Sequence, residues 1–151
     1  MPEKKNIIYS NSDTEKVDIS NDEWKKILPE SVYEIAREKG TEKPFTGTYW
    51  NRFETGTYYC AACGNPLFKS DAKFNSSCGW PSFFEPITKG SIIYAPDNSY
   101  GMKRTEVMCG RCKSHLGHVF DDGPKPSGLR YCINSVVLHF DEIPGTENDG
   151  K

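Results

Sequence analysis

The chain lacks the long apolar segments that are typical of signal peptides and membrane-spanning helices. Its N-terminal region is polar, and its apolar stretch is limited to Ile7, Ile8 and Tyr9. A signal peptide needs an apolar region of about 7–15 residues, and a membrane helix needs about 18 or more. We therefore expect a cytoplasmic protein with no membrane partner. In such a reducing compartment, cysteines are more often metal ligands or reactive thiols than structural disulfides.

An excess of charge of one sign is also lacking. The 151 residues include 19 Lys and Arg against 21 Asp and Glu, which gives a net charge of −2. Domains that bind nucleic acid or acidic membranes usually carry a basic patch or stripe, and no basic run here is long enough to form one. The sequence therefore predicts no nucleic-acid partner. No internal repeat is visible apart from two cysteine pairs.

The remaining pattern predicts one mostly β domain over residues 21–140. Helices are expected over 21–28, where Asn21 caps a turn that contains acids, and over 30–39, with Gly40 as the stop. From Phe45 to Phe140 the chain consists of short β-like runs, of which 130–140 is the longest. Residues 1–20 and 141–151 are polar and without periodicity, and are expected to be flexible tails.

Six cysteines are present, and four of them form two Cys-x-x-Cys pairs, Cys60 with Cys63 and Cys109 with Cys112. Two such turns can bring four thiolates together in a closed tetrahedral zinc site, which would be structural because it leaves no open coordination position. Residues 64–108 separate the pairs, a longer gap than the roughly 15–20 residues of a zinc ribbon. The site would therefore join distant segments.

Two alternatives to this zinc site stay open at this point. One pair could be a thioredoxin-like redox motif, although that motif belongs at a helix start in a βαβ context that is missing here. Alternatively, Cys109, Cys112, His115 and His118 have the spacing of a local Cys₂His₂ site.

The two remaining cysteines, Cys78 and Cys132, have different surroundings. In a β-strand, Arg130, Cys132 and Asn134 project to the same face. A guanidinium beside the thiol favours the thiolate, which is the nucleophilic form. Cys132 could equally be a small buried core residue, which is common for a free cysteine.

Cys78 lies in a loop with small residues before it and Trp80, Phe83 and Phe84 after it. Such a loop could approach another sulfur and line a pocket, or its aromatic residues could simply belong to the core. His115 and His118 are the histidines nearest to Cys132 in sequence and could transfer a proton near neutral pH. Asp122 could orient one of them.

Taken together, these segments resemble the B-type methionine sulfoxide reductases, which act on the R epimer of the sulfoxide. The resemblance covers residues 23–140. It rests on Gly-Thr-Glu-Lys-Pro-Phe-Thr-Gly (40–47), the two cysteine pairs, Cys-Gly-Trp-Pro-Ser-Phe (78–83), His-Leu-Gly-His-Val-Phe-Asp-Asp-Gly-Pro (115–124) and Arg-Tyr-Cys-Ile-Asn-Ser (130–135).

The resemblance implies a fold and a set of site residues. The fold is a β-tent-like domain of two antiparallel sheets with a short N-terminal helical arm and a zinc site far from the reacting sulfur. Cys132 corresponds to the nucleophile and Cys78 to the resolving thiol. Trp80 and Phe83 are expected to contact the substrate. The other positions that match the surroundings of the site are His115, His118, Asp122, Arg130 and Asn134.

The reaction implied by the resemblance is reduction of free or protein-bound methionine-R-sulfoxide. Cys132 would become a sulfenic acid, Cys78 would condense with it to a disulfide, and thioredoxin or a similar dithiol would reduce that disulfide. A monomer that needs no organic cofactor is expected. Two other functions remain to be weighed: a zinc-binding module without catalysis, and a general disulfide reductase or peroxide sensor.

Overall fold

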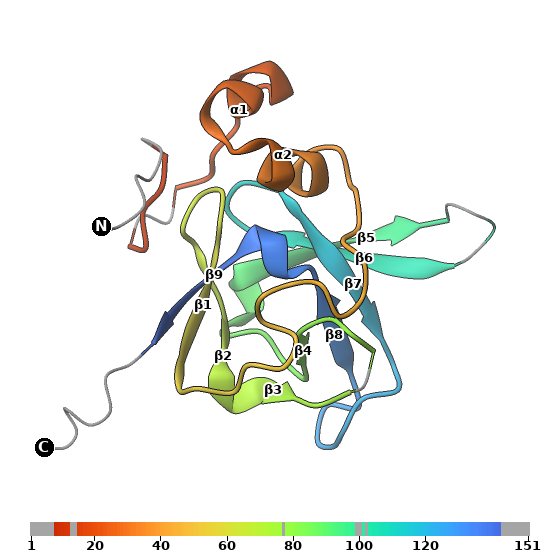
Figure 1. Ribbon diagram of the computed structural model, residues 1–151. Helices are drawn as coiled ribbons and strands as arrows, with labels where there is room; N and C mark the ends of the chain where they lie inside the picture. Colours follow the sequence, from red (N-terminus) through yellow and green to blue (C-terminus); the bar gives the residue numbers. More distant parts are fainter. Residues whose placement is uncertain (1–7, 13–14, 77, 99–100, 102, 143–151) are drawn as a thin grey trace, which may run out of the picture.

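The computed structural model describes residues 8–12, 15–76, 78–98, 101 and 103–142 of the chain. Within these ranges the protein is mainly β, with two antiparallel sheets and two short helices near the N-terminus (Figure 1). One sheet has the strand order β2-β1-β9, and the other has the order β3-β4-β8-β7-β6-β5. This arrangement confirms the predicted fold class. The strands are β1 (Gly56–Cys60), β2 (Pro66–Lys69), β3 (Lys73–Phe74), β4 (Ser82–Phe83), β5 (Ile92–Asp97), β6 (Arg104–Cys109), β7 (His115–Phe120), β8 (Arg130–Ile133) and β9 (Leu138–Glu142).

The two helices are α1 (Asn21–Ile27) and α2 (Glu30–Ala36), so the second ends earlier than predicted. The N-cap of α1 is Ser20, one residue before the expected Asn21, and its hydroxyl accepts a hydrogen bond of 3.2 Å from the backbone N–H of Glu23. Trp24 is fully buried and fixes α1 against the domain. No helix in the described ranges is long and apolar enough to span a membrane.

The longest predicted strand, 130–140, is in fact two strands in different sheets. A short 3₁₀ turn, Ser135–Val137, separates β8 from β9. Val137 and Leu138 are both buried, so the apolar pattern continues through the turn and does not reveal the break. This crossover places β8 in the middle of the larger sheet, where it carries Cys132.

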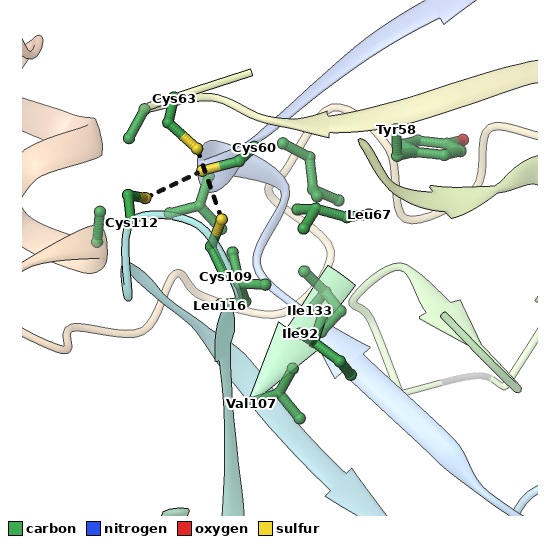
Figure 2. Packing of buried hydrophobic residues seen from close by; sticks show 14 of the residues in the cluster. Tyr58, Cys60, Cys63, Leu67, Ile92, Val107, Cys109, Cys112, Leu116 and Ile133 are labelled. Carbon is green, nitrogen blue, oxygen red and sulfur yellow. Dashed lines mark hydrogen bonds between the residues drawn. The ribbon is translucent and has the colours of Figure 1, made fainter. Parts of the chain in front are cut away.

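The core fills the space between the sheets with aromatic and aliphatic side chains. Phe83 and Phe68 are stacked with ring centroids 4.3 Å apart, and Tyr58 meets Phe83 edge to face at 5.1 Å. Leu67 and Ile133 continue this packing toward the four cysteines of the paired motifs (Figure 2). Burial of such side chains contributes about 1.5–3 kcal/mol each.

A segment preceding α1, residues 8–12 and 15–20, packs against the turns of both cysteine pairs, and we call it the N-terminal strap. Ile8, Val17 and Ile19 are partly buried against the core. The flexibility expected for residues 1–20 stays a prediction. The strap also has polar contacts with the domain. Its hydrogen bonds run from Ser10 N–H to Cys63 O (2.8 Å), Asn11 Nδ2 to Gly64 O (2.8 Å), Lys16 Nζ to Gly110 O (2.7 Å) and Val17 N–H to Arg111 O (2.8 Å). At the other end, β9 extends to Glu142, and the rest of the expected C-terminal tail lies outside the described residues.

Candidate active site and metal centre

The four cysteines of the two pairs form one buried cluster. Their sulfur atoms all lie within 4.8 Å of one another. Cys60 and Cys112 are 3.7 Å apart at their sulfurs, and Cys63 and Cys109 are 3.6 Å apart (Figure 2). A tetrahedral ion with metal–sulfur bonds of about 2.3 Å would hold its ligands about 3.8 Å apart. The cluster therefore fits a tetrahedral metal ion.

The chain around the cluster also suits thiolate ligands. Cys60 ends β1 and Cys109 ends β6, so the ligands come from both sheets and join segments distant in sequence. Gly64 turns the first pair with a φ of 84°, a conformation that favours glycine. The backbone N–H of Arg111 (3.4 Å) and Nδ2 of Asn65 (3.6 Å) donate to the sulfur of Cys109.

The alternative Cys₂His₂ site is not formed. Nδ1 of His115 lies 2.7 Å from Oε2 of Glu106, and Nε2 of His118 lies 2.7 Å from Oδ2 of Asp97. Among the described residues, the four-cysteine cluster is the only group of three or more Cys, His, Asp or Glu that could hold a metal ion.

The other two cysteines meet in a separate cavity of about 290 Å³. Six of its lining residues were predicted from the sequence, and the others are Thr41, Arg104, Gly117 and Phe120. The six are Cys78, Trp80, His118, Arg130, Cys132 and Asn134. Arg130, Cys132 and Asn134 all line this cavity, as expected for residues on one face of a β-strand.

The larger sheet fixes Cys132 in position. On β8 it pairs with Ser82 of β4 on one side and with His118 of β7 on the other. The sulfur of Cys78, from the loop before β4, lies 3.4 Å from the sulfur of Cys132. Ser76 donates to the Cys78 sulfur at 2.9 Å. The arrangement brings two thiols into contact at the edge of a cavity.

The pKa values of Cys78 and Cys132 depend on each other. The pKa of Cys78 is lowered to about 4, chiefly by the hydrogen bond from Cys132, with Ser76 and Ser82 acting in the same direction. The pKa of Cys132 is raised by the same hydrogen bond and then by burial, whereas Arg130 lowers it. Arg130 therefore acts in the predicted direction, but the neighbouring sulfur outweighs it. One proton is shared between two sulfurs, so the pair carries a thiolate at neutral pH.

Trp80 and Asn134 are anchored through the same segment of chain. The indole Nε1 of Trp80 donates to the carbonyl of Glu42 at 3.0 Å, and Oδ1 of Asn134 accepts from the backbone N–H of Glu42 at 2.9 Å. The amide of the buried Asn134 also donates to the carbonyl of Leu116 at 2.9 Å. Asn134 thus connects β7, the end of β8 and the loop that holds the indole ring.

The two predicted histidines have different positions. His118 lines the cavity that contains Cys132, whereas His115 is buried beside Glu106 and does not line that cavity. Burial lowers the pKa of His115, with Glu106 opposing. The rings of the two histidines are 5.5 Å apart at their centroids.

Asp122 does not orient either histidine, contrary to the expectation. It is exposed and binds Arg130 instead, through contacts of 2.8 Å to Nε and 3.1 Å to Nη2. The hydrogen bond to Arg130 lowers the pKa of Asp122. The guanidinium carbon of Arg130 also lies 4.5 Å from the ring centroid of Phe120. Asp122 therefore fixes the guanidinium of Arg130 rather than a histidine.

Phe83 was predicted to contact the substrate, but it is fully buried. Alternation along β4 turns Ser82 toward Cys132, and Phe83 faces the opposite side of the sheet, where it stacks on Phe68. Trp80 is therefore the aromatic residue of that motif that lines the cavity.

Sequence reasoning missed the acids that bind the histidines, Asp97 and Glu106. Glu106 is on β6, which lies beside β7 in the sheet order, and Asp97 is on β5, one strand further along. The sequence carries no local signal for these contacts, because only the pairing of β6 with β7 sets Glu106 beside the histidines.

Comparison with known proteins agrees with this geometry. The SelR domain family model matches residues 28–142. The peptide methionine sulfoxide reductase MsrB of Agrobacterium fabrum is 53% identical over 128 residues, which cover 85% of this chain and 95% of that protein. The proteins with the same description from Teredinibacter turnerae and Methanosarcina barkeri are 57% and 53% identical, over 81% and 89% of this chain and 90% and 92% of their own lengths. The chain therefore belongs to the SelR family, the B-type methionine sulfoxide reductases that its sequence motifs resemble.

Proposed function

We propose that this chain reduces methionine-R-sulfoxide to methionine, with Cys132 as the nucleophile and Cys78 as the resolving thiol. The observation that carries the proposal is the contact of 3.4 Å between the two sulfurs at a cavity that Trp80 and His118 also line. Membership of the SelR family supports the substrate class. The choice of epimer rests on that family membership alone.

The residues of the cavity suggest a division of roles in the first step. Cys132 passes its proton to the Cys78 sulfur that it contacts and attacks the sulfoxide sulfur as a thiolate, which forms an S–S bond. The S–O bond breaks as an acid protonates the oxygen, which leaves as hydroxide. The hydroxide then attacks the Cys132 sulfur, and the S–S bond breaks with its electron pair going to the departing methionine. His118 pairs with Cys132 across β7 and β8 and lines the cavity, so it is a better candidate for the acid than the buried His115. The products are methionine and a Cys132 sulfenic acid. Trp80 offers the methyl group an apolar wall.

The second step requires only a short movement. The Cys78 sulfur attacks the Cys132 sulfur, and the hydroxyl leaves as water once it has taken up a proton. A disulfide bond is about 2.05 Å long, so the sulfurs must approach by about 1.4 Å from their contact distance of 3.4 Å. Thioredoxin or a similar dithiol would then reduce the disulfide by exchange.

We propose zinc as the metal of the four-cysteine cluster. Four thiolates, a closed tetrahedral geometry and complete burial fit zinc in a structural role. The ion would stabilise the junction between the ends of β1 and β6 and would take no part in the reaction. None of its ligands lines the cavity that contains Cys132.

The extent of the catalytic unit is part of the same proposal. The family match over residues 28–142 supports one catalytic domain close to the predicted 21–140. Six unbridged cysteines suit a cytoplasmic, reducing location. We infer that the domain acts as a monomer.

The test is to offer the two epimers of a peptide methionine sulfoxide separately, with dithiothreitol or with thioredoxin, its reductase and NADPH. Turnover of the R epimer alone is expected. Cys132→Ser should abolish turnover with either reductant, and Cys78→Ser should lose only the thioredoxin-dependent turnover. Mass spectrometry should detect the Cys78–Cys132 disulfide after one turnover without reductant.

Other outcomes would favour the other functions considered. Turnover of peroxide or small disulfides without turnover of sulfoxide would favour a peroxide sensor or a general disulfide reductase. If no cysteine outside the metal cluster reacted rapidly with iodoacetamide, the protein would be a zinc-binding module without catalysis.

A further inference from the structure

Asp97 contacts His118 directly, although the sequence motifs assign it no role. Oδ2 of Asp97 lies 2.7 Å from Nε2 of His118 and 3.4 Å from Nη2 of Arg104. The side chains of Asp97 and His118 are 21% and 12% exposed, so solvent screens this contact only in part.

The sheet places Asp97 on the opposite side of His118 from the reactive thiol. His118 pairs with Cys132 of β8 on one side and with Glu106 of β6 on the other. Asp97 is contributed by β5, one strand further along. In the order of the strands, His118 therefore lies between Asp97, whose carboxylate it contacts, and Cys132.

A second cavity, of about 550 Å³, adjoins this histidine. Asp97, Glu106 and His115 line it together with His118. Thr41, Arg104 and His118 line both cavities. His118 therefore has access to a second space while a substrate occupies the space beside Cys132.

We propose that Asp97 is the positioning residue of His118: it orients the imidazole toward the cavity of Cys132 and stabilises its protonated form, and the second cavity is where His118 regains its proton. The catalytic meaning of this inference rests on the proposed sulfoxide reduction. In that step a thiolate, a sulfoxide and an imidazolium become a sulfenic acid, a sulfide and a neutral imidazole. Charge and protons balance, and each turnover requires the imidazole to be protonated again.

Several other charged or titratable groups surround His118, and they act in both directions. Arg104, Arg130 and Lys39 disfavour the imidazolium, as does a protonated His115, whereas Glu106 and the thiolate of the Cys78–Cys132 pair favour it. Glu106 is bound by His115 at 2.7 Å and by Lys39 at 3.3 Å. Asp97 is the carboxylate in hydrogen-bond contact with His118, and its charge should therefore have the largest favourable effect.

The test is to titrate the histidines by NMR in ¹⁵N-histidine-labelled protein, which contains only three of them. Asp97→Asn retains the shape of the side chain and removes the charge that contacts Nε2 of His118, and it should move the midpoint of the His118 titration to lower pH. The alkaline limb of the kcat/KM profile for the sulfoxide should move in the same direction. Asp97→Glu should restore both. The matched control is Asp71→Asn, an exposed aspartate in the 3₁₀ turn Ser70–Ala72, which should change neither.

A structural role for Asp97 would give a different result. If Asp97 only stabilised the β5–β6 hairpin, Asp97→Asn would lower the thermal midpoint and leave the His118 titration and the pH profile in place, which would overturn the inference. Asp97→Ser, which is smaller, serves if the asparagine variant does not fold. A shifted titration in a protein that does not reduce sulfoxide would refute the proposed function and leave the coupling of Asp97 to His118 standing.

Discussion

Gly117 is the position where one added methyl group should most directly displace Cys132. It is buried on β7, opposite Ile133 of β8, and lines the cavity of Cys132. A Cβ atom there would overlap the carbonyl oxygen of Cys132 and would lie 3.0 Å from its carbonyl carbon and 3.1 Å from the Cα of Ile133. Ordinary carbon contacts are about 3.5–4.0 Å. Because the overlap with the carbonyl oxygen is the closest of these contacts, Gly117→Ala must push β8 away by about 1 Å or more.

This displacement has two measurable consequences. Overpacking of a core costs about 1–3 kcal/mol, which corresponds to about 2–4 °C of melting temperature per kcal/mol for a domain of this size. Movement of a reacting group by about 1 Å can reduce the rate as much as 100-fold. We expect a melting temperature lower by several degrees and a kcat/KM lower by a factor on the order of 10–100.

Calorimetry and steady-state kinetics with a sulfoxide peptide check both expectations. The matched control is Gly90→Ala, because an added Cβ at Gly90 meets no atom within 4 Å; that variant should resemble the wild type. If Gly117→Ala had wild-type stability and activity, the close packing of β7 on β8 would not be what positions Cys132.

Three further changes should have distinct effects. Cys132→Ala removes the hydrogen bond that chiefly lowers the pKa of Cys78 to about 4. The pH midpoint of Cys78 alkylation by iodoacetamide should therefore rise toward about 8.5. A midpoint still near 4 would show that Ser76 and Ser82 cause the lowered pKa. Burial lowers the pKa of Lys73 from 10.5 to about 8. The unfolded chain therefore binds more protons between these pH values, and the wild type should gain stability with rising pH. The stability of Lys73→Met relative to wild type should fall by on the order of 1–3 kcal/mol across that window in urea titrations, and a constant difference would contradict the shift. Arg111 is buried and donates to the carbonyl of Cys63 at 2.6 Å and to the N-terminal strap. Arg111→Met should cost about 1–3 kcal/mol and speed metal release to a colorimetric chelator, and unchanged release would show that the strap does not protect the metal.

Features that depend only on residues close together in the sequence could be predicted from the sequence directly. The two thiols of a Cys-x-x-Cys pair converge on one centre because of a single tight turn, so each pair could be recognised without knowledge of the sheets. That the two pairs meet in one cluster, and that His115 and His118 do not join it, is seen only in the structure. The face shared by Arg130, Cys132 and Asn134 follows from the period of a strand in the same way. The order of the family motifs was equally visible, and it identified the family before any geometry was known.

Features that depend on which strands lie side by side could not be read from the sequence. The apolar run 130–140 does not reveal that a turn divides it between two sheets, because the residues on both sides of the turn are buried. Asp122 is close to His118 in sequence but binds Arg130, whereas Asp97, at a distance in sequence, binds His118. Long-range pairing alone decides such contacts. The sequence by itself predicted the two cysteine pairs as candidate metal ligands and the face shared by Arg130, Cys132 and Asn134, and it identified the family. Only the tertiary structure decided which acid binds which base around Cys132, because it sets the order of the strands in the sheet.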